Sequence, residues 1–442
     1  MAKYEVKDGV GIIPEGTTMI EKSAFENRSD LKSIVIPNSV TVIGQDAFRV
    51  CKSLKDVIIP DSVTEIWRGA FGFCSALTHI DIPCSVTKIV GSAFERTGLT
   101  SIAIPDSVTE IGDYAFNGCT GLTSIVITDS VTEIGVEAFS GCTGLTSIVI
   151  PDSVTEIGNS AFYGCTSLTS IAVSKGNKTY DSRNNCNAII NTESNTLIVG
   201  CKNTVIPNSV KAIGNRAFSG CTGLTSIVIP DSVTVIANFA FYGCTGLTSI
   251  VIPDSVTETG WNVFQGCTGL TSIVIPDSMT EISNSAFWNC TGLTNIVIPE
   301  SVMEIQSHAF SDCTGLTSII IPSSLTKIEY CAMHNCTGLT SIVIPESVTE
   351  IGDYAFDFCS GLKTVSILGP VKTMTETFRY CSSLEIVTLG VGIKKMDDVF
   401  KGCTSLKTIN VPSKKGDYYK KRLPSKLHSL IVELPAVKKA KK

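Results

Sequence analysis

The chain of 442 residues lacks any hydrophobic run long enough to cross a membrane. No apolar stretch approaches the roughly 18 to 20 residues that a membrane helix needs. The opening stretch, MAKYEVKDGVGIIPEG, also lacks the basic and apolar regions of a signal peptide. Hydrophobic residues nevertheless make up 43% of the chain and charged residues only 17%. This composition predicts a folded protein with a large core and no membrane insertion.

Histidine and aromatic residues are also scarce, with four His in the chain and 7% aromatic residues. No Gly-rich phosphate loop, paired-Cys zinc motif or serine-triad signature occurs in the sequence. Catalysis needs a cleft with convergent polar groups and tuned pKa values, for which this chain offers few candidates. We therefore expect no catalysis and no cofactor.

The net charge of −6 is unevenly spread along the chain. Residues 413–442 hold ten Lys and Arg against Asp417 and Glu433, which leaves the remaining body at −14. An acidic, aromatic-poor body argues against nucleic-acid binding, which needs Lys and Arg clustered along one face. The basic tail is either a solvated terminus or a segment attracted to an acidic partner.

A repeat of 23 residues, occasionally 22, occupies most of the chain. Its aromatic anchor recurs sixteen times, at Phe25, Phe48, Phe71, Phe94, Phe116, Phe139, Phe162, Phe218, Phe241, Phe264, Phe287, Phe310, Met333, Phe356, Phe378 and Phe400. One repeat reads L-x-x-I-x-I-P-x-x-V-x-x-I-x-x-x-A-F-x-x-C. Such a unit cannot bury its own apolar side, so neighbouring units must stack, with their strands about 4.8 Å apart.

Apolar and polar residues alternate in the segment LTSIVIP of the repeat, as they do in a strand with one buried face, and the proline ends the strand. In the copy that starts at Leu145, we expect Leu145, Ile148 and Ile150 to point inward and Val149 to point outward. In the second half of the repeat the apolar residues recur at irregular intervals, which favours a bent closing segment over a helix. The prediction is a solenoid of mostly strand and loop, with a parallel sheet on one face. Its expected parts are an N-terminal cap (1–22), the solenoid (23–412) and a basic C-terminal cap and tail (413–442).

The repeat resembles the bacterial BspA-like class of leucine-rich repeats, from about Pro14 to Pro412. An insert at about 175–203 and the ending VPSKKGDYYKKRLPSKLHSLIVE are similar to the island and C-terminal cap of such proteins. The resemblance implies a non-catalytic interaction scaffold, displayed at the cell surface or secreted, that binds host or neighbouring-cell proteins. The export signal expected of such proteins is not found in this chain.

Fourteen of the eighteen cysteines occupy one repeat position, three residues after the anchor. Stacked neighbours would lie about 5 Å apart, within disulfide reach, but all of them would point the same way, which disfavours pairing. Zinc needs ligands that converge from several directions. We interpret these cysteines as a ladder of small buried hydrophobic residues.

The insert reads as a hairpin that turns near Glu193 and Ser194. Such a turn places Cys186 and Cys201 opposite each other, either as two free thiols or, in an exported protein, as a disulfide. The hairpin is either a contact surface for a partner or a tolerated insertion.

Stacking of the coils near residue 330 should bring together several metal-ligating side chains. His308 should lie above Cys331, and His334 above Asp357. These groups are competent zinc ligands, and His with Cys could in principle form a nucleophile pair, but the spacing fits no known signature. The alternatives are surface variation, weak metal binding and catalysis, and surface variation is the favoured interpretation.

Candidate partner-binding residues lie where the repeat departs from its consensus. In the central coils the strand face repeats Thr, Ser and Val, a flat surface without the Trp, Tyr and Arg anchors of tight interfaces. The start of this face carries Lys55, His79 and Asp81, and the closing segments carry Tyr163, Tyr242, Trp261, Trp288 and Tyr354. We expect the function to be protein binding by an adhesin-like scaffold; the alternatives are a structural or self-assembling spacer and, with less support, an enzyme or metal-dependent binding protein.

Overall fold

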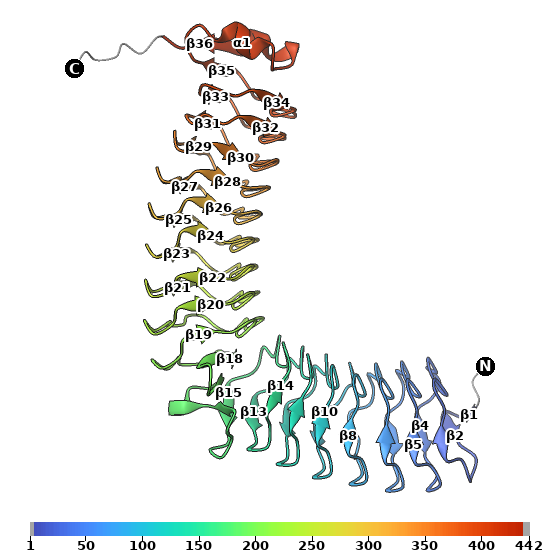
Figure 1. Ribbon diagram of the computed structural model, residues 1–442. Coiled ribbons are helices and arrows are strands. Elements are labelled where there is room, and N and C mark those ends of the chain that lie inside the picture. The colour runs from blue at the N-terminus through green and yellow to red at the C-terminus, as the bar shows by residue number, and fades with distance from the viewer. Residues whose placement is uncertain (1–3, 436–442) are drawn as a thin grey trace. The chain divides into compact units, whose positions relative to one another are not determined.

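The structure is a computed structural model that describes residues 4–435. The chain divides into two units, Met1–Leu224 and Thr225–Lys442, which we call the N-terminal and C-terminal units. Each unit is a solenoid of stacked coils, as Figure 1 shows. The predicted fold class is confirmed: the coils are strand and loop with parallel in-register sheets, and helix is confined to short segments.

The strand face of the N-terminal unit is a row of short parallel strands. Its strands are β4 (Ser33–Val35), β6 (Asp56–Ile58), β9 (Ser101–Ala103), β11 (Ser124–Val126), β13 (Ser147–Ile150) and β15 (Ser170–Val173). The register follows the repeat, so that Ile148 of β13 lies beside Ile171 of β15. As predicted, Leu145, Ile148 and Ile150 are buried while Val149 is exposed. Alternation of side chains across a strand therefore determines the inner and outer faces.

A second row of two-residue strands follows the proline of each coil. It forms one sheet in the order β14 (Glu156–Ile157), β12 (Glu133–Ile134), β10 (Glu110–Ile111), β8 (Lys88–Ile89), β7 (Glu65–Ile66), β5 (Val42–Ile43) and β3 (Met19–Ile20). The closing segments form a further ladder, in which alternate backbone N–H groups donate to carbonyls of the next coil. The N–H of Phe48, for example, donates to the carbonyl of Ala70 at 2.8 Å. Most neighbouring coils are thus hydrogen-bonded to each other along the strand face, the second row and the closing segments.

The C-terminal unit repeats this arrangement. Its strand face consists of β21 (Ser249–Val251), β23 (Ser272–Val274), β25 (Asn295–Val297), β27 (Ser318–Ile320), β29 (Ser341–Ile344), β31 (Thr364–Ile367), β33 (Ile386–Leu389), β35 (Thr408–Val411) and β36 (Ile431–Glu433). Its second row consists of β20 (Val235–Ile236), β22 (Glu258–Thr259), β24 (Glu281–Ile282), β26 (Glu304–Ile305), β28 (Lys327–Ile328), β30 (Glu350–Ile351), β32 (Thr373–Thr375) and β34 (Lys395–Asp397).

Short segments cap the first coil of the N-terminal unit and the last coil of the C-terminal unit. At the N-terminus β1 (Glu5–Lys7) and β2 (Val10–Ile12) form an antiparallel hairpin, and the ring of Tyr4 stacks on Phe25 at 5.3 Å. At the C-terminus α1 (Gly416–Lys420) and the 3₁₀ segment η2 (Ser425–Leu430) precede β36, and Tyr419 is buried against the last coils. The last residues of the predicted basic tail, 436–442, and residues 1–3 of the predicted N-terminal cap lie outside the described residues.

The anchor phenylalanines form the spine of the core. Neighbouring rings are stacked with centroids 5.1 to 5.7 Å apart from Phe25 to Phe162. The same stacking joins Phe241 to Phe310 in the C-terminal unit. Since each ring contacts the ring before and after it, stability depends on interfaces between coils.

The closing segment bends through two residues with left-handed backbone in each coil. One precedes the alanine of the AF pair, as His308 does with φ 57°, and the other lies two residues after the anchor, as Gly141 does with φ 71°. Glycine adopts this region without steric cost, whereas a β-branched residue there is an outlier. At the second position the coil of Phe48 carries Val50, with φ 62°.

Replacing Val50 with Gly should stabilise the N-terminal unit. Relief of left-handed strain gains about 1–2 kcal/mol, and the extra freedom of glycine in the unfolded chain costs about 0.4–1 kcal/mol. We expect urea denaturation of Val50→Gly to give a free energy of unfolding about 0.5–1 kcal/mol above that of the unmodified chain. The reciprocal variant Gly141→Val should destabilise the unit. Equal stability of both variants and the unmodified chain would argue against strain at this position.

Candidate interaction site

The strand face of the C-terminal unit presents a stripe of exposed β-branched side chains. We define this aliphatic stripe as Val251, Val274, Val297 and Ile320, which are 62% to 74% exposed. Beside it the threonine hydroxyls donate to the backbone of the preceding coil, as Thr294 does to the carbonyl of Thr271 at 3.2 Å. The threonines thus stiffen the face, and the aliphatic stripe is its exposed apolar part.

Charged candidates lie near the start of the strand face of the N-terminal unit. His79 and Asp81 lie together, with Nε2 and Oδ1 3.3 Å apart, and both side chains are largely exposed. Lys55 is exposed on the preceding coil. Their role in partner binding stays a prediction.

The aromatic candidates differ in how much of each ring is accessible. Trp261 is 61% exposed. In contrast, the indole N–H of Trp288 donates to Asp312 at 2.7 Å, and the hydroxyl of Tyr354 donates to Glu376 at 2.9 Å. Tyr242 lies edge-on to Phe239, and in the N-terminal unit the guanidinium of Arg216 lies 6.0 Å from the ring of Tyr163. Trp261 is the most accessible of these rings.

Asp357 is the centre of a charged network in the neighbourhood of His308. Its carboxylate is 1% exposed and accepts hydrogen bonds from Arg379 at 3.0 and 3.3 Å. As predicted, His334 lies over it, with Nδ1 3.6 Å from the carboxylate. Arg379 also packs against the ring of Tyr354 at 4.9 Å. The buried carboxylate is therefore compensated by a guanidinium of the next coil.

The remaining two members of the predicted cluster have other contacts. The ring of His308 lies 5.6 Å from Trp288 and 5.4 Å from Tyr330, and burial lowers the pKa of His308. Burial raises the pKa of the Cys331 thiol, which favours the less nucleophilic protonated form. Within residues 4–435, no three or more His, Cys, Asp or Glu side chains are grouped so as to hold a metal ion.

The cysteine ladder has a hydrogen-bonding role that the sequence did not suggest. The carbonyl of Phe48 accepts the N–H of Cys51 from its own coil at 3.2 Å and the thiol of Cys74 from the next coil at 3.0 Å. The same thiol contact, at 3.0 to 3.2 Å, is made by Cys51, Cys119, Cys142, Cys165, Cys267, Cys290, Cys313, Cys336, Cys359, Cys381 and Cys403. The prediction that these cysteines are small buried hydrophobic residues was therefore incomplete. Each of these thiols fills a small space and also donates a hydrogen bond to a buried carbonyl.

The insert forms the predicted hairpin, with β17 (Ala188–Asn191) and β18 (Thr196–Gly200) antiparallel around a turn at 192–195. β18 then pairs in parallel with β19 (Ala212–Ile213). Cys186 and Cys201 are free thiols in the structure. The thiol of Cys186 is directed to the carbonyl of Ala188, and that of Cys201 to the carbonyl of Asn187.

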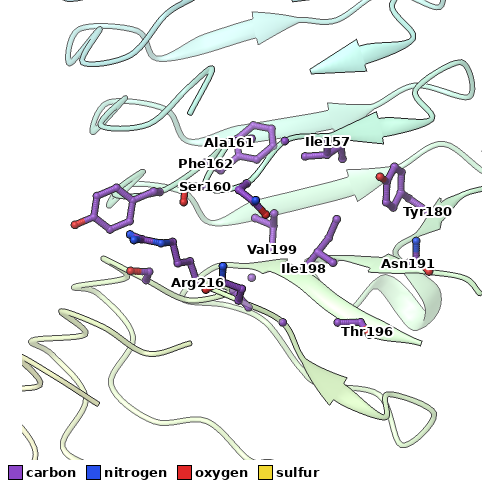
Figure 2. Close-up of a pocket in the computed structure, with 18 of the residues that line it drawn as sticks. Ile157, Ser160, Ala161, Phe162, Tyr180, Asn191, Thr196, Ile198, Val199 and Arg216 are labelled. Atoms are coloured by element: carbon purple, nitrogen blue, oxygen red, sulfur yellow. The ribbon is translucent and has the colours of Figure 1, made fainter. Parts of the chain in front are cut away.

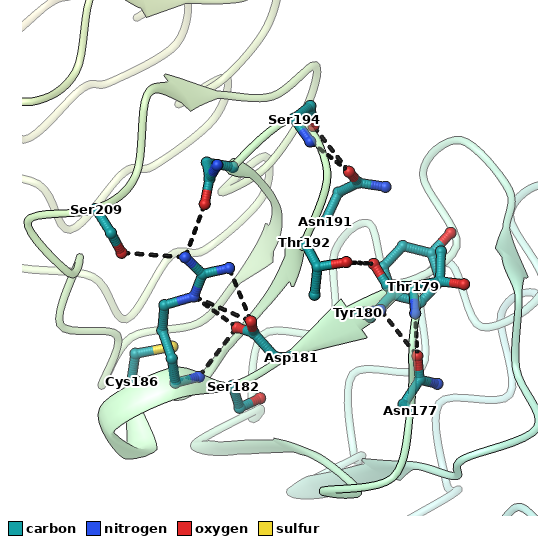
Figure 3. Close-up of polar contacts among 12 residues, drawn as sticks. Asn177, Thr179, Tyr180, Asp181, Ser182, Cys186, Asn191, Thr192, Ser194 and Ser209 are labelled. Atoms are coloured by element: carbon teal, nitrogen blue, oxygen red, sulfur yellow. Dashed lines mark hydrogen bonds and ion pairs between the residues drawn. The ribbon is translucent and has the colours of Figure 1, made fainter.

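Two side chains tie the base of the insert to the coils beside it, Asn177 to the coil before and Arg183 to the coil after. The amide of Asn177 donates to the carbonyls of Pro151 and Val154, and its oxygen accepts two backbone N–H groups at the start of β16 (Tyr180–Asp181). Arg183, in the 3₁₀ turn η1 (Arg183–Asn185), pairs with Asp181 and also donates to Asn195 and Ser209. Figure 3 shows this network around Asp181 and Asn177. The insert is thus fixed to the solenoid by side chains that the repeat lacks.

A cavity of about 230 Å³ lies where the insert interrupts the repeat. Figure 2 shows it bounded by Phe162 on one coil, by Tyr180 and Asn191 of the insert, and by Arg216 on the coil that resumes. The cavity marks the point at which the regular stacking of coils is broken.

A profile of the BspA type leucine rich repeat region matches residues 11–123, 87–197, 196–317 and 304–421. The chain belongs to the BspA-type leucine-rich repeat family. The matched ranges of this BspA-type chain run through the insert and into the C-terminal cap.

Solved structures of bacterial leucine-rich repeat proteins are similar to this BspA-type chain. A leucine rich cell surface protein of Faecalibacterium prausnitzii is 35% identical, with 76% of this chain and 82% of that one covered and a TM-score of 0.58. A leucine-rich repeat protein of Eubacterium ventriosum is 28% identical over 80% of this chain and 91% of that one, with a TM-score of 0.62. A leucine-rich repeat protein of Bacteroides ovatus, 24% identical over 98% of each chain with a TM-score of 0.52, shares the fold. A search of curated protein sequences found no match.

The helices of this BspA-type chain are a single turn or little more. None of those found within residues 4–435 has the length and hydropathy needed to cross a bilayer.

Proposed function

We propose that this protein is a non-catalytic, adhesin-like scaffold that acts at the cell surface and binds proteins of a host or of neighbouring cells. The observation that carries the proposal is the aliphatic stripe: four exposed β-branched side chains in register on a stiff, uncharged sheet. Exposed apolar patches of this kind mark interaction surfaces. Similarity to a cell surface protein of F. prausnitzii supports the compartment.

The geometry around the candidate catalytic side chains favours binding over chemistry. The thiol of Cys331 has a raised pKa, the carboxylate of Asp357 is paired with Arg379, and the imidazole of His308 packs among aromatic rings. A nucleophile and a general base within reach of one substrate atom are the minimum for acyl transfer, and these groups do not supply them.

Charge placed on the aliphatic stripe should abolish partner capture. The double variant Val274→Lys, Val297→Lys buries two ammonium groups in any apolar interface, so we expect at least a tenfold loss of protein recovered from extracts of cell-surface and matrix proteins. Met303→Lys, which adds a charge at a half-exposed position outside the stripe, is the control and should capture as the unmodified chain does.

Two results would refute the proposal. One is capture by the stripe variant equal to that of the control. The other is a failure of the unmodified chain to capture any protein reproducibly; in that case, growth of the particle mass with concentration in light scattering would support the self-assembling spacer.

A further inference from the structure

The hydrogen-bonded ladder of the closing segments is interrupted after the coil of Phe162. In the coil before, the N–H of the anchor Phe139 donates to the carbonyl of Ala161 at 2.8 Å. The N–H groups that should continue this ladder into the next coil are those of Ser160 and Phe162. Neither has a hydrogen-bond partner among residues 4–435. Backbone N–H groups inside a protein are almost always paired, so two adjacent rungs without an acceptor are an exception that asks for a partner.

The insert is the cause of this gap. The repeat would pair the N–H of Phe162 with the carbonyl of Ala217, but this carbonyl accepts the N–H of Gly200, at the end of β18, at 2.8 Å. The ladder closes again directly afterwards, where the N–H of Gly164 donates to the carbonyl of Ser219 at 3.4 Å. The gap is therefore confined to two backbone donors of one coil.

These two donors belong to residues that line the cavity of about 230 Å³ described above. Figure 2 shows Ser160 and Phe162 on its wall. The cavity opens to solvent, because Ile157 is half-buried, whereas Ile134 and Ile213, at the corresponding position of the neighbouring coils, are fully buried. A cavity of about 150 Å³ accepts a molecule of the size of benzene, so this one has room for a single sugar ring.

The charge of the lining is positive. Arg216 lines the cavity from the coil that resumes after the insert, and none of the described residues that line it is Asp or Glu. The guanidinium of Arg216 lies 6.0 Å from the ring of Tyr163, which also lines the cavity. A carboxylate accepts hydrogen bonds from a guanidinium and from backbone N–H groups, and such charge-assisted bonds are the stronger kind. The lining therefore favours an anionic group.

Polar side chains add a second requirement. Asn159, Ser160 and Asn215 line the cavity, and their side chains make no hydrogen bond within the part of the chain that the structure describes. Two amides and a hydroxyl offer both donors and acceptors, which pair with the hydroxyl groups of a ligand. A plain carboxylate such as acetate would leave them to water, whereas a hydroxylated acid would use them.

We propose that this cavity binds a small hydroxylated carboxylic acid, with the chemistry of an acidic monosaccharide. Its carboxylate accepts hydrogen bonds from the two free N–H groups, those of Ser160 and Phe162, and from the guanidinium of Arg216. Its hydroxyl groups pair with Asn159 and Asn215. The site goes beyond the proposed function, because its ligand is not a protein and its residues all belong to the N-terminal unit, whereas the aliphatic stripe belongs to the C-terminal unit.

Calorimetry of the intact chain with glucuronate, galacturonate and N-acetylneuraminate tests the proposal. We expect at least one of these acids to bind with a Kd below about 1 mM. Glucose lacks the charge, and acetate and phenylacetate lack the hydroxyl groups, so each of these three should bind at least tenfold more weakly. The methyl glycoside of the acid that binds distinguishes two sources of the ligand. Equal affinity for the glycoside indicates the terminal residue of a glycan, and at least tenfold weaker binding indicates the free acid.

A pair of arginine variants tests the role of the charge. Arg216→Gln should weaken binding of the acid at least tenfold and leave the weak binding of glucose unchanged. Arg68→Gln is the matched control, because it removes an exposed arginine from a regular coil outside the lining of the cavity, and it should bind as the unmodified chain does. Thermal melts show whether both variants fold.

Amide hydrogen exchange tests the two backbone donors directly. The bound acid should slow exchange of the N–H groups of Ser160 and Phe162 at least tenfold and leave that of Phe139, which is already paired, unchanged. Four results would overturn the proposal: no acid binds below about 1 mM, glucose or acetate binds as tightly, Arg216→Gln binds as the control does, or exchange at the two donors stays the same. None of these results depends on protein capture by the aliphatic stripe, so either proposal can fail without the other.

Discussion

Raising the pH from 8 to 10 should lower the free energy of unfolding of each unit by about 4 kcal/mol, because the buried thiols resist ionisation in the folded state. Burial raises the pKa of Cys119 to about 11 and those of Cys51 and Cys165 to about 12. In the C-terminal unit it raises the pKa values of Cys267, Cys313 and Cys403 to about 12. An unfolded thiol has its pKa near 9.0, so that the unfolded chain loses these protons first.

The sign of the effect follows from the direction of these shifts. A thiol whose pKa is higher in the folded state contributes its full stability below about pH 9, and this contribution disappears as the pH rises toward 12. At pH 10 each such thiol lowers the free energy of unfolding by about 1.4 kcal/mol. The three thiols named in each unit together remove about 4 kcal/mol from that unit, a large part of the stability of an ordinary domain.

Urea denaturation followed by circular dichroism between pH 7 and pH 10.5, under reducing conditions, measures this loss. The triple variant Cys267→Ser, Cys313→Ser, Cys403→Ser keeps a hydrogen-bond donor at each position and has no thiol to ionise there. We expect its C-terminal unit to lose about 4 kcal/mol less than that of the unmodified chain between pH 8 and 10. If the two chains show the same pH dependence, ionisation of the ladder is not the cause.

Removing one ring from the phenylalanine spine should cost about 3–5 kcal/mol. Phe264 is 1% exposed, and its ring is stacked between those of Phe241 and Phe287 at 5.5 and 5.6 Å. Phe264→Ala leaves a cavity between three coils and removes two stacking contacts, each worth about 0.5–1.5 kcal/mol. Because coils are stabilised chiefly by their neighbours, the loss should extend to the adjacent coils of the C-terminal unit.

Phe358→Ala is the control for this prediction. Phe358 also contacts an aromatic ring, that of Tyr380 at 4.8 Å, but it is 41% exposed and lies outside the spine. We expect it to cost less than about 1 kcal/mol in urea denaturation. A similar cost for Phe264→Ala would show that the spine contributes little to stability. Hydrogen exchange of the neighbouring coils should report the spread of the defect.

The period of 23 residues was sufficient to predict the solenoid, the parallel strand face and the inward side chains. Leu145 and Ile148 are buried and Val149 is exposed, as the alternation indicated, because one coil cannot bury its apolar side except against another. The hairpin at 188–200 could also be predicted, since its strand and turn signals are local in the sequence.

Features that depend on contacts between coils could be identified only from the tertiary structure. The thiol of Cys74 meets the carbonyl of Phe48, a residue 26 positions earlier, and no local pattern reveals an acceptor at that distance along the chain. The same holds for Arg379, which compensates the buried carboxylate of Asp357 from the next coil. The contacts of the insert likewise depend on how it packs against the solenoid: the carbonyl of Cys186 accepts the N–H of Val205, and the side-chain amide of Asn203 donates to the carbonyl of Thr169. The repeated sequence thus determines the fold of each coil, whereas the chemical properties of residues that depart from the repeat depend on their contacts with neighbouring coils.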